Sequence, residues 1–316
     1  TFDGAGHSIS NMTVLVTVNT VRAAGLFGKV EDATIKNLAL SNTNVSAGPG
    51  NFYPSLGSLV GEMPSGTIDN VSVRNAVVAG RTYAGGLVGN AGSTKITNCS
   101  VEAKVDGAPN VAGAVPGGSQ HGGIAGTTSG GSIIENCIAA GSVAPGMATG
   151  GIVGQANGVV INCIALNTLD GAQNTGGIIG GPQGTGDQPN VMVNNSVALN
   201  QYINSSNAMS GTISGKTQHP VTDSYAWTGI INSLGSFGAS GTAGKNATSA
   251  EVWNNFEFYE NIGFDSAIWS LGTGNFKLPV ITGHPAMNTD ASYLAPSTPA
   301  EPVVTSVTIT GMPENN

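Results

Sequence analysis

A short glycine-flanked block, Gly-x-Leu/Ile-x-Gly, recurs along the chain and constrains the fold more than any other feature. Complete copies close at Gly61, Gly89, Gly126, Gly154 and Gly180, a shorter copy closes at Gly28, and a degraded copy closes at Gly215. These closing glycines lie 33, 28, 37, 28, 26 and 35 residues apart. A period in this range indicates a repeat architecture, in which each unit contacts only its neighbours.

A second block follows each copy of the first, with one further copy before them, and consists of an apolar residue, any residue, and then Asn or Asp. Its polar members are Asn11, Asn37, Asn70, Asn98, Asn136, Asn162, Asn195 and Asp223. Both blocks are short β-type segments without helical periodicity. Such strands cannot bury a face alone, so the pattern predicts an all-β fold, a parallel β-solenoid of about eight coils spaced about 4.8 Å apart.

This geometry assigns a role to each block. The recurring Asn is predicted to form a ladder at a corner, where its amide bonds to the copy in the next coil and tolerates left-handed backbone. The glycines of the first block are predicted to supply positive φ at corners. Charged residues would stack on their own kind, which explains why they make up only 9 % of the chain while Gly reaches 48 of 316 residues.

Charge and hydropathy exclude several partners. The net charge of −8 with only ten Lys and Arg argues against nucleic acid, because phosphate contacts need clustered positive charge. No apolar run reaches about 18 residues, so we expect no insertion of this segment into a membrane.

The two linked blocks resemble the GLUG-motif repeats of bacterial surface proteins. The best matches are Gly85–Gly89 followed by Ile96-Thr97-Asn98-Cys99, and Gly150–Gly154 followed by Ile161-Asn162-Cys163. The resemblance covers about residues 1–230. It implies a right-handed parallel β-helix on an extracellular or surface-anchored protein, often from Bacteroidetes or Gram-positive bacteria. The motif also occurs in IgA-specific metallopeptidases outside their catalytic domain, so it implies location better than activity.

The repeat fades after Asp223, which divides the chain into four parts. Residues 1–230 are predicted to be the solenoid and residues 231–290 a C-terminal cap, because residues 225–285 hold all three Trp and five of the eight Phe. Thr248 and Glu251 form a possible capping box for a short helix over about 249–255. Residues 291–302 read as a Pro-rich linker. Residues 303–316 resemble the start of a bacterial Ig-like domain, as expected for a piece of a longer protein.

The aromatic residues of the cap have two interpretations. They are expected to seal the last coil, which would otherwise expose unpaired strands and an apolar core. A carbohydrate-stacking role for the Trp residues is the alternative.

No catalytic, metal or cofactor site emerges from the sequence. The four His residues form no pair at ligand spacing, and the glycine-rich strands lack the Lys of a phosphate loop. Cys99, Cys137 and Cys163 each follow a ladder Asn in consecutive coils, so they should stack in an interior position. We expect buried free thiols; a disulfide between neighbours is the alternative, since one coil spacing falls within disulfide range.

Insertions before the first block would project from one edge of the solenoid, and such an edge is often the binding face. It would carry Phe52, Tyr53, Arg81, Tyr83 and His121, which suit contact with a glycan or a host or bacterial surface protein. The alternative is that these loops are merely tolerated insertions at the surface.

We therefore expect a monomeric, non-catalytic surface module, adhesin-like or a stalk. The alternatives are a carbohydrate-active β-helix enzyme, a lyase or hydrolase with neighbouring carboxylates in a groove, and a spacer without a ligand.

Overall fold

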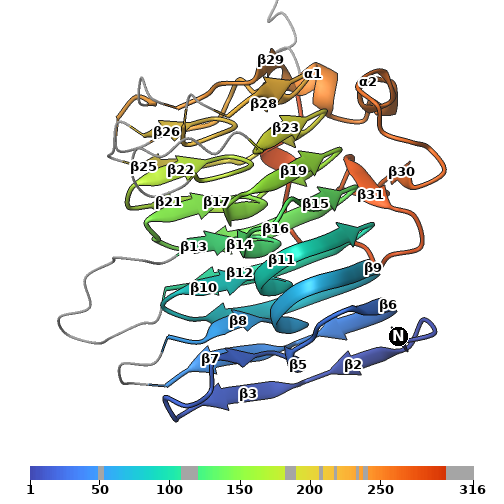
Figure 1. Cartoon of the computed structure of the whole chain (residues 1–316). Coiled ribbons are helices and arrows are strands. Elements are labelled where there is room, and N and C mark those ends of the chain that lie inside the picture. The colour runs from blue at the N-terminus through green and yellow to red at the C-terminus, as the bar shows by residue number, and fades with distance from the viewer. Residues whose placement is uncertain are drawn as a thin grey trace, which may run out of the picture.

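The structure is a computed structural model that describes residues 1–48, 53–107, 120–181, 190–205, 209–216, 219–232, 235–237 and 241–296. In this part the chain is mostly β-strand and climbs through successive levels stacked on one another (Figure 1). Seven levels begin with a strand of one seven-stranded sheet; with the first level, which lacks such a strand among the described residues, this makes eight. The remaining strands of the levels belong to a 22-stranded sheet.

The strands of the lower four levels are as follows. The first level holds β1 (Phe2–Asp3), β2 (Ser8–Ser10) and β3 (Thr13–Val16). The second holds β4 (Ala23–Ala24), β5 (Phe27–Lys29), β6 (Ala33–Ser41) and β7 (Asn44–Ala47). The third holds β8 (Ser55–Gly57) and β9 (Val60–Ala79). The fourth holds β10 (Tyr83–Gly85), β11 (Val88–Thr97) and β12 (Ser100–Asp106).

The upper four levels repeat this order with shorter strands. The fifth holds β13 (Gln120–Gly122), β14 (Ala125–Thr128), β15 (Ser132–Glu135) and β16 (Ile138–Val143). The sixth holds β17 (Ala148–Gly150), β18 (Val153–Gln155), β19 (Gly158–Ile161), β20 (Ile164–Ala165) and β21 (Thr168–Gly171). The seventh holds β22 (Asn174–Gly176), β23 (Met192–Asn194), β24 (Val197–Ala198) and β25 (Ile203–Ser205). The eighth holds β26 (Ser210–Gly211), β27 (Val221–Thr222) and β28 (Tyr225–Trp227), and β29 (Lys245–Ala247) pairs on top of β28.

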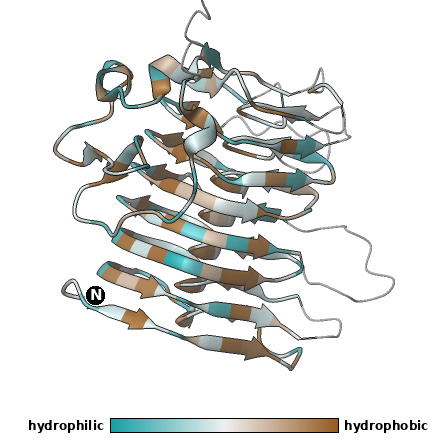
Figure 2. Cartoon of the chain, turned by 180° about the vertical axis from the view of Figure 1, so that it is seen from behind, coloured by the Kyte–Doolittle hydropathy of each residue, from teal (hydrophilic) through white to brown (hydrophobic). Residues whose placement is uncertain are grey.

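Among the described residues, the paired strands of neighbouring levels run parallel and join equivalent residues of neighbouring repeats. One row of such partners runs through Ile35, Ile68, Ile96, Ile134, Val160, Val193 and Val221. All but the last are buried, and they belong to the interior cluster. The predicted all-β class and parallel stacking of repeats are thereby confirmed. Figure 2 shows apolar residues recurring from level to level in the same way.

The block glycines serve close packing between levels rather than positive φ. None of them adopts the left-handed region among the described residues, so that expectation was wrong. A Cβ on Gly122 would instead overlap the carbonyl of Ala125 and crowd the amide of Gly154 in the next level. Backbones meet here at distances that leave no room for a side chain, which is why glycine recurs.

The left-handed corners are formed by the recurring Asn and Asp residues. Their φ values lie between 45° and 58° for Asn11, Asn37, Asn70, Asn98, Asn136, Asn162, Asn195 and Asp223. Asn and Asp accept this conformation more readily than other residues with a side chain, because a short polar side chain can bond locally. The corner turns the chain while the strands on either side stay in register.

Asn11 lies on a different row from the other seven, which corrects its predicted place. β2 pairs with the C-terminal half of β6, Ser10 opposite Ser41, so Asn11 stands below Asn42. Asn42 donates to Asn11 at 3.3 Å, and Asn75 donates to Asn42 at 2.8 Å. This second row is confined to the lower levels, because a register shift between Val101 and Ala103 interrupts it. Below Asn37, the side-chain partner is instead Asp3, which stands opposite Lys36 in the register and accepts from the Asn37 amide.

A C-terminal segment, residues 248–296, folds against the outside of the levels. It contains α1 (Ser249–Val252), α2 (Phe256–Asn261), the antiparallel pair β30 (Trp269–Leu271) and β31 (Pro279–Ile281), and the 3-10 helix η1 (Ser292–Leu294). The predicted helix begins at 249 as expected, and Glu251 accepts from the Thr248 backbone and hydroxyl at 2.7 Å. It ends at Val252 rather than 255, and a second helix follows.

The C-terminal segment packs along the side of the upper levels, whereas the sequence predicted that residues 231–290 seal the last coil; of the aromatic residues in that range, Phe237 packs against the interior cluster. Figure 1 shows α1 and α2 beside the last levels and β30–β31 lower down, beside β15 and β19. The predicted linker also begins too early, since Ala291 and Leu294 are buried and the Tyr293 hydroxyl donates to the Leu199 carbonyl at 2.6 Å. The remainder of that linker from 297, and the predicted strand over 303–316, lie outside the described residues.

This packing follows from outward-facing apolar residues in the upper levels. Cys137, just before β16, and Ala139 within it face the interior cluster, while Ile138 and Ala140 of β16 join a second cluster outside it. Equivalent positions in the next two levels also hold apolar residues. The outer cluster therefore joins Ile138, Ile164, Leu166, Val197 and Leu199 to Phe264, Trp269, Leu278 and Leu294 of the C-terminal segment.

Candidate functional site

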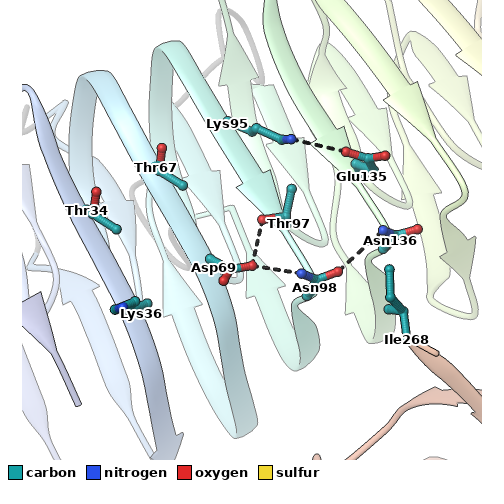
Figure 3. Close-up of a pocket in the computed structure, with 10 residues that line it drawn as sticks. All are labelled: Thr34, Lys36, Thr67, Asp69, Lys95, Thr97, Asn98, Glu135, Asn136 and Ile268. Atoms are coloured by element: carbon teal, nitrogen blue, oxygen red, sulfur yellow. Dashed lines mark hydrogen bonds and ion pairs between the residues drawn. The ribbon is translucent and has the colours of Figure 1, made fainter. Parts of the chain in front are cut away.

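An open polar groove runs across the outer face of four strands, β6, β9, β11 and β15. Its volume is about 470 Å³. Figure 3 shows the residues that line it: Thr34, Lys36, Thr67, Asp69, Lys95, Thr97, Asn98, Glu135, Asn136 and Ile268. Nine of these belong to the repeats and one to the C-terminal segment.

The parallel register arranges the groove side chains in two rows. One row joins Thr34, Thr67 and Lys95, and the other joins Lys36, Asp69, Thr97 and Glu135. These residues alternate along their strands with the buried Ile35, Ile68, Ile96 and Ile134. Successive side chains of a strand point to opposite faces, so burial of the isoleucines directs the polar residues outward.

The charges in the groove balance and are locally paired. Lys36 lies 3.4 Å from Asp3 of the level below, and Lys95 lies 3.4 Å from Glu135 of the level above. Asp69 accepts hydrogen bonds of 2.8 Å from the Thr97 hydroxyl and the Asn98 amide. Two lysines and two carboxylates thus line the groove, and like charges never occupy neighbouring levels of a row.

Ile268 forms one side of the groove and comes from the turn before β30. Asp265 holds this turn by accepting from the Ala267 amide at 2.8 Å. The next residue, Trp269, is buried, and its indole N–H lies 3.5 Å from the Asn136 side-chain oxygen. The C-terminal segment is therefore anchored on the row of corner Asn residues and closes one side of the groove.

His284 makes a second anchor on the same row. Its Nε2 lies 2.8 Å from the Asn70 side-chain oxygen, which can only accept, so Nε2 carries the proton. Its Nδ1 then accepts from the Ser100 hydroxyl at 2.7 Å. Burial, followed by the nearby Arg74 cation, lowers the pKa of His284 to about 4. The imidazole is thus neutral at physiological pH, as this bonding pattern requires.

A buried ion pair beside His284 extends this contact. Arg74 donates to Glu102 at 3.2 Å, with side chains only 9 % and 14 % exposed. Glu102 also accepts from the Thr289 hydroxyl at 3.1 Å and the Asn288 amide at 3.2 Å. The C-terminal segment is tied in this way to the third and fourth levels as well as to the upper ones.

The corner Asn residues form an interrupted hydrogen-bonded row. Asn37 donates to Asp3 at 3.0 Å, Asn70 to Asn37 at 2.8 Å, and Asn136 to Asn98 at 3.3 Å. Asn98 donates to Asp69 because His284 occupies the Asn70 oxygen. At the top of the row, Asp223 pairs with Lys245 at 2.5 Å. Asn162 and Asn195 share the corner conformation, although no side-chain bond joins them in the described contacts.

The predicted binding edge is not assembled as expected. His121 is completely buried in β13, with Nδ1 3.1 Å from the Ala144 carbonyl, so it cannot meet a partner at the surface. Its backbone lies in the closely packed sheet that starts each level, which explains the burial. Tyr83 and Arg81 are half-buried, Tyr53 is 57 % exposed, and Phe52 lies outside the described residues.

The three cysteines are free and buried, as expected. The thiols of Cys99, Cys137 and Cys163 donate to the carbonyls of Thr97, Glu135 and Ile161 at 3.0, 3.2 and 3.2 Å. Burial raises the pKa of the Cys99 and Cys137 thiols, which disfavours the reactive thiolate. Within the described residues, no three His, Cys, Asp or Glu side chains are arranged to hold a metal.

Strand alternation explains most of the groove from the sequence. The residue between the buried isoleucine and the corner Asn must face outward, and this gives Lys36, Asp69, Thr97 and Glu135. Strand alternation two residues earlier would have added Thr34, Thr67 and Lys95. Ile268 could not be found this way, because it comes from more than 130 residues further along the chain.

Comparison with known proteins supports the repeat assignment. Residues 80–106 match the family model described as the GLUG motif, which confirms the resemblance for that unit. A crystal structure of a candidate immunoglobulin A1 protease from Bacteroides ovatus is similar, with a TM-score of 0.51 and 18 % identity over 89 % of this chain and 77 % of that chain. At this identity the likeness concerns the fold alone. No curated protein sequence matches the chain significantly.

Proposed function

We propose that the chain is a non-catalytic module of a secreted or surface-anchored bacterial protein, adhesin-like, in which a rigid rod carries a recognition groove. The levels are coils of a right-handed parallel β-helix. The observation that carries this proposal is the continuous parallel register, in which equivalent residues pair from β1 up to β29. In a stack of this kind each level packs directly on the next, so we expect a stiff rod without a hinge.

Lateral contacts add to this rigidity. The C-terminal segment touches the third level through His284 and Asn70, the fourth through Ser100 and Glu102, and the seventh through Tyr293 and Leu199. One segment thus braces levels that otherwise touch only their neighbours. The GLUG motif supports an extracellular location. The helices of the described part, six residues at most, are too short to span a bilayer.

Surface location is testable in the bacterium that encodes the chain. Antibodies raised against the purified chain should label intact cells or the culture medium, and external protease should remove the cell-bound signal. A cytoplasmic marker protein, protected in the same cells, controls for lysis. Confinement of the chain to the cytoplasmic fraction would refute the proposal.

A second candidate function is cleavage of a polysaccharide, which one observation favours. Asp69 and Glu135 both line the groove and stand two levels apart, about 10 Å by the level spacing, near the range for an inverting carboxylate pair. However, Lys95 pairs with Glu135, and two donors hold Asp69. Incubation with a panel of polysaccharides, followed by assays for reducing ends and unsaturated uronate, distinguishes the two. Activity abolished by Asp69→Asn would establish the enzyme.

A further inference from the structure

We propose that the groove binds three or four consecutive units of an uncharged linear glycan that lies along the stacking direction of the levels. This inference rests on the proposed function and names the ligand class of the same groove. It follows from three properties of the groove: the spacing of its side chains, its charge, and the placement of hydroxyl and apolar groups.

The spacing favours a ligand whose repeat matches one level. Equivalent side chains such as Thr34 and Thr67 are neighbours in register, so they recur every 4.8 Å or so. A sugar ring in a linear β-linked glycan has about this length, so successive units lie beside successive levels, and two of them meet Thr34 and Thr67. An extended peptide advances about 3.3 Å per residue and would lose this match after one or two residues.

The charge favours a ligand without net charge. A polyanion would gain from Lys36 and Lys95 but would be repelled by Asp69 and Glu135 in the same groove, and a polycation would meet the reverse. Each of these four groups already has a partner of opposite charge or a hydrogen-bond donor. A charged polymer would have to displace those partners, whereas hydroxyl groups can add to them.

The remaining groups suit the two kinds of surface that a sugar presents. Thr34 and Thr67 are partly exposed and make no side-chain hydrogen bond within the described part of the chain, so both hydroxyls are available. Ile268 presents an apolar side chain at the opposite margin of the groove (Figure 3). Ring C–H groups can pack on Ile268 while the sugar hydroxyls bond to the threonines and Asp69.

Calorimetric titration of the whole chain tests this inference. The probes are β-1,4-linked oligosaccharides of glucose, N-acetylglucosamine, mannose and xylose, each with two to six units. We expect at least one series to bind with affinity that rises up to three or four units and then levels off. Thr67→Val, which keeps the side-chain shape, should weaken binding at least five-fold. The matched control is Thr222→Val, an exposed threonine on β27 beyond the groove, which should leave binding unchanged.

Three results would overturn the inference. The first is no binding of any series at millimolar concentration. The second is equal binding by wild type, Thr67→Val and Asp69→Asn, with circular dichroism showing that all three are folded. The third is tighter binding of an oligouronate or an extended peptide than of any neutral oligosaccharide. Surface labelling is independent of these measurements. If the chain is exposed on the cell but binds no glycan, the proposal of a surface module still holds and only the glycan inference fails.

Discussion

At the residue scale, the corner Asn residues combine two properties that few side chains share. They accept a left-handed backbone, and their amides bond to the neighbouring level, as Asn70 does to Asn37 at 2.8 Å. The register decides which residues meet, and this is why Asn37 bonds to Asp3, the partner of Lys36, whereas Asn11 stands below Asn42. The left-handed corner was predictable from residue type, whereas the membership of each row was not.

Substitution of Asn37 separates these two contributions. Asn37→Gly removes both side-chain hydrogen bonds of Asn37 but keeps the backbone conformation. It should lower the free energy of unfolding by about 1–2 kcal/mol. Asn37→Ala should cost about 1 kcal/mol more, because a left-handed backbone is unfavourable for alanine. Urea unfolding followed by circular dichroism measures both. Asn44→Ala, on an exposed strand position, is the control; equal stability of the Gly and Ala variants would contradict this account.

His284 should make stability depend on pH. Burial and Arg74 lower its pKa to about 4 in the folded chain, whereas an unfolded His titrates near 6.5. Between these values the unfolded chain binds the proton and the folded chain does not, so stability falls as the pH drops from about 6.5 towards 4. Above about pH 6.5 the stabilisation that His284 contributes is fully present.

Urea midpoints at pH 7.5 and pH 5.0 test this prediction. His284→Gln should show a smaller loss between the two pH values than wild type. His219, whose pKa burial also lowers to about 4, contributes in the same direction, so His219→Gln is the comparison variant. An unchanged loss in His284→Gln would show that its protonation is not linked to folding.

At the scale of elements, the glycines of the first block allow neighbouring levels to approach. A Cβ on Gly150 would overlap the Val153 carbonyl and crowd the Gly180 amide of the next level. The sequence showed where glycine is needed but suggested the wrong cause, because close approach and positive φ select the same residue. Only the backbone geometry of the structure shows which of these two causes applies.

Gly150→Ala is therefore expected to destabilise the stack by about 1–3 kcal/mol or more, as overpacking does. Gly48→Ala is the control, since its Cβ would come no closer than 3.3 Å to the Val16 carbonyl. Thermal unfolding monitored by circular dichroism compares the two. A Gly150→Ala melting temperature equal to that of Gly48→Ala would show that the levels can separate without cost.

At the scale of the whole molecule, the C-terminal segment determines which outer surfaces remain exposed. It covers Ile138, Ile164 and Val197 and leaves the polar face of β6, β9 and β11 open as the groove. The runs Ile138-Ala139-Ala140 and Val197-Ala198-Leu199 carry a sequence signal for this cover. They are continuously apolar, as strands buried on both faces are.

Trp269→Ala should loosen the C-terminal segment while the levels stay intact. The buried indole packs on Phe264, with ring centroids 5.0 Å apart, and its loss should cost about 3–5 kcal/mol. Hydrogen exchange should show faster exchange over 249–294 and unchanged protection in β9 and β11. The half-buried Trp253 gives a milder control in Trp253→Ala. Simultaneous loss of protection in both regions would show that they unfold as one unit.

The repeat, the all-β class, the parallel stacking of its units and the left-handed corners were predictable from the sequence, because these depend on residue type at a fixed period. Packing between distant parts of the chain fixed which corner residues share a row, where the C-terminal segment lies, and that Ile268 lines the same groove as Lys36 and Asp69. The two sets differ in how far along the chain the interactions that fix them act. Local backbone preference and strand alternation act within one repeat, whereas the groove depends on packing between residues that the sequence separates by more than a hundred positions.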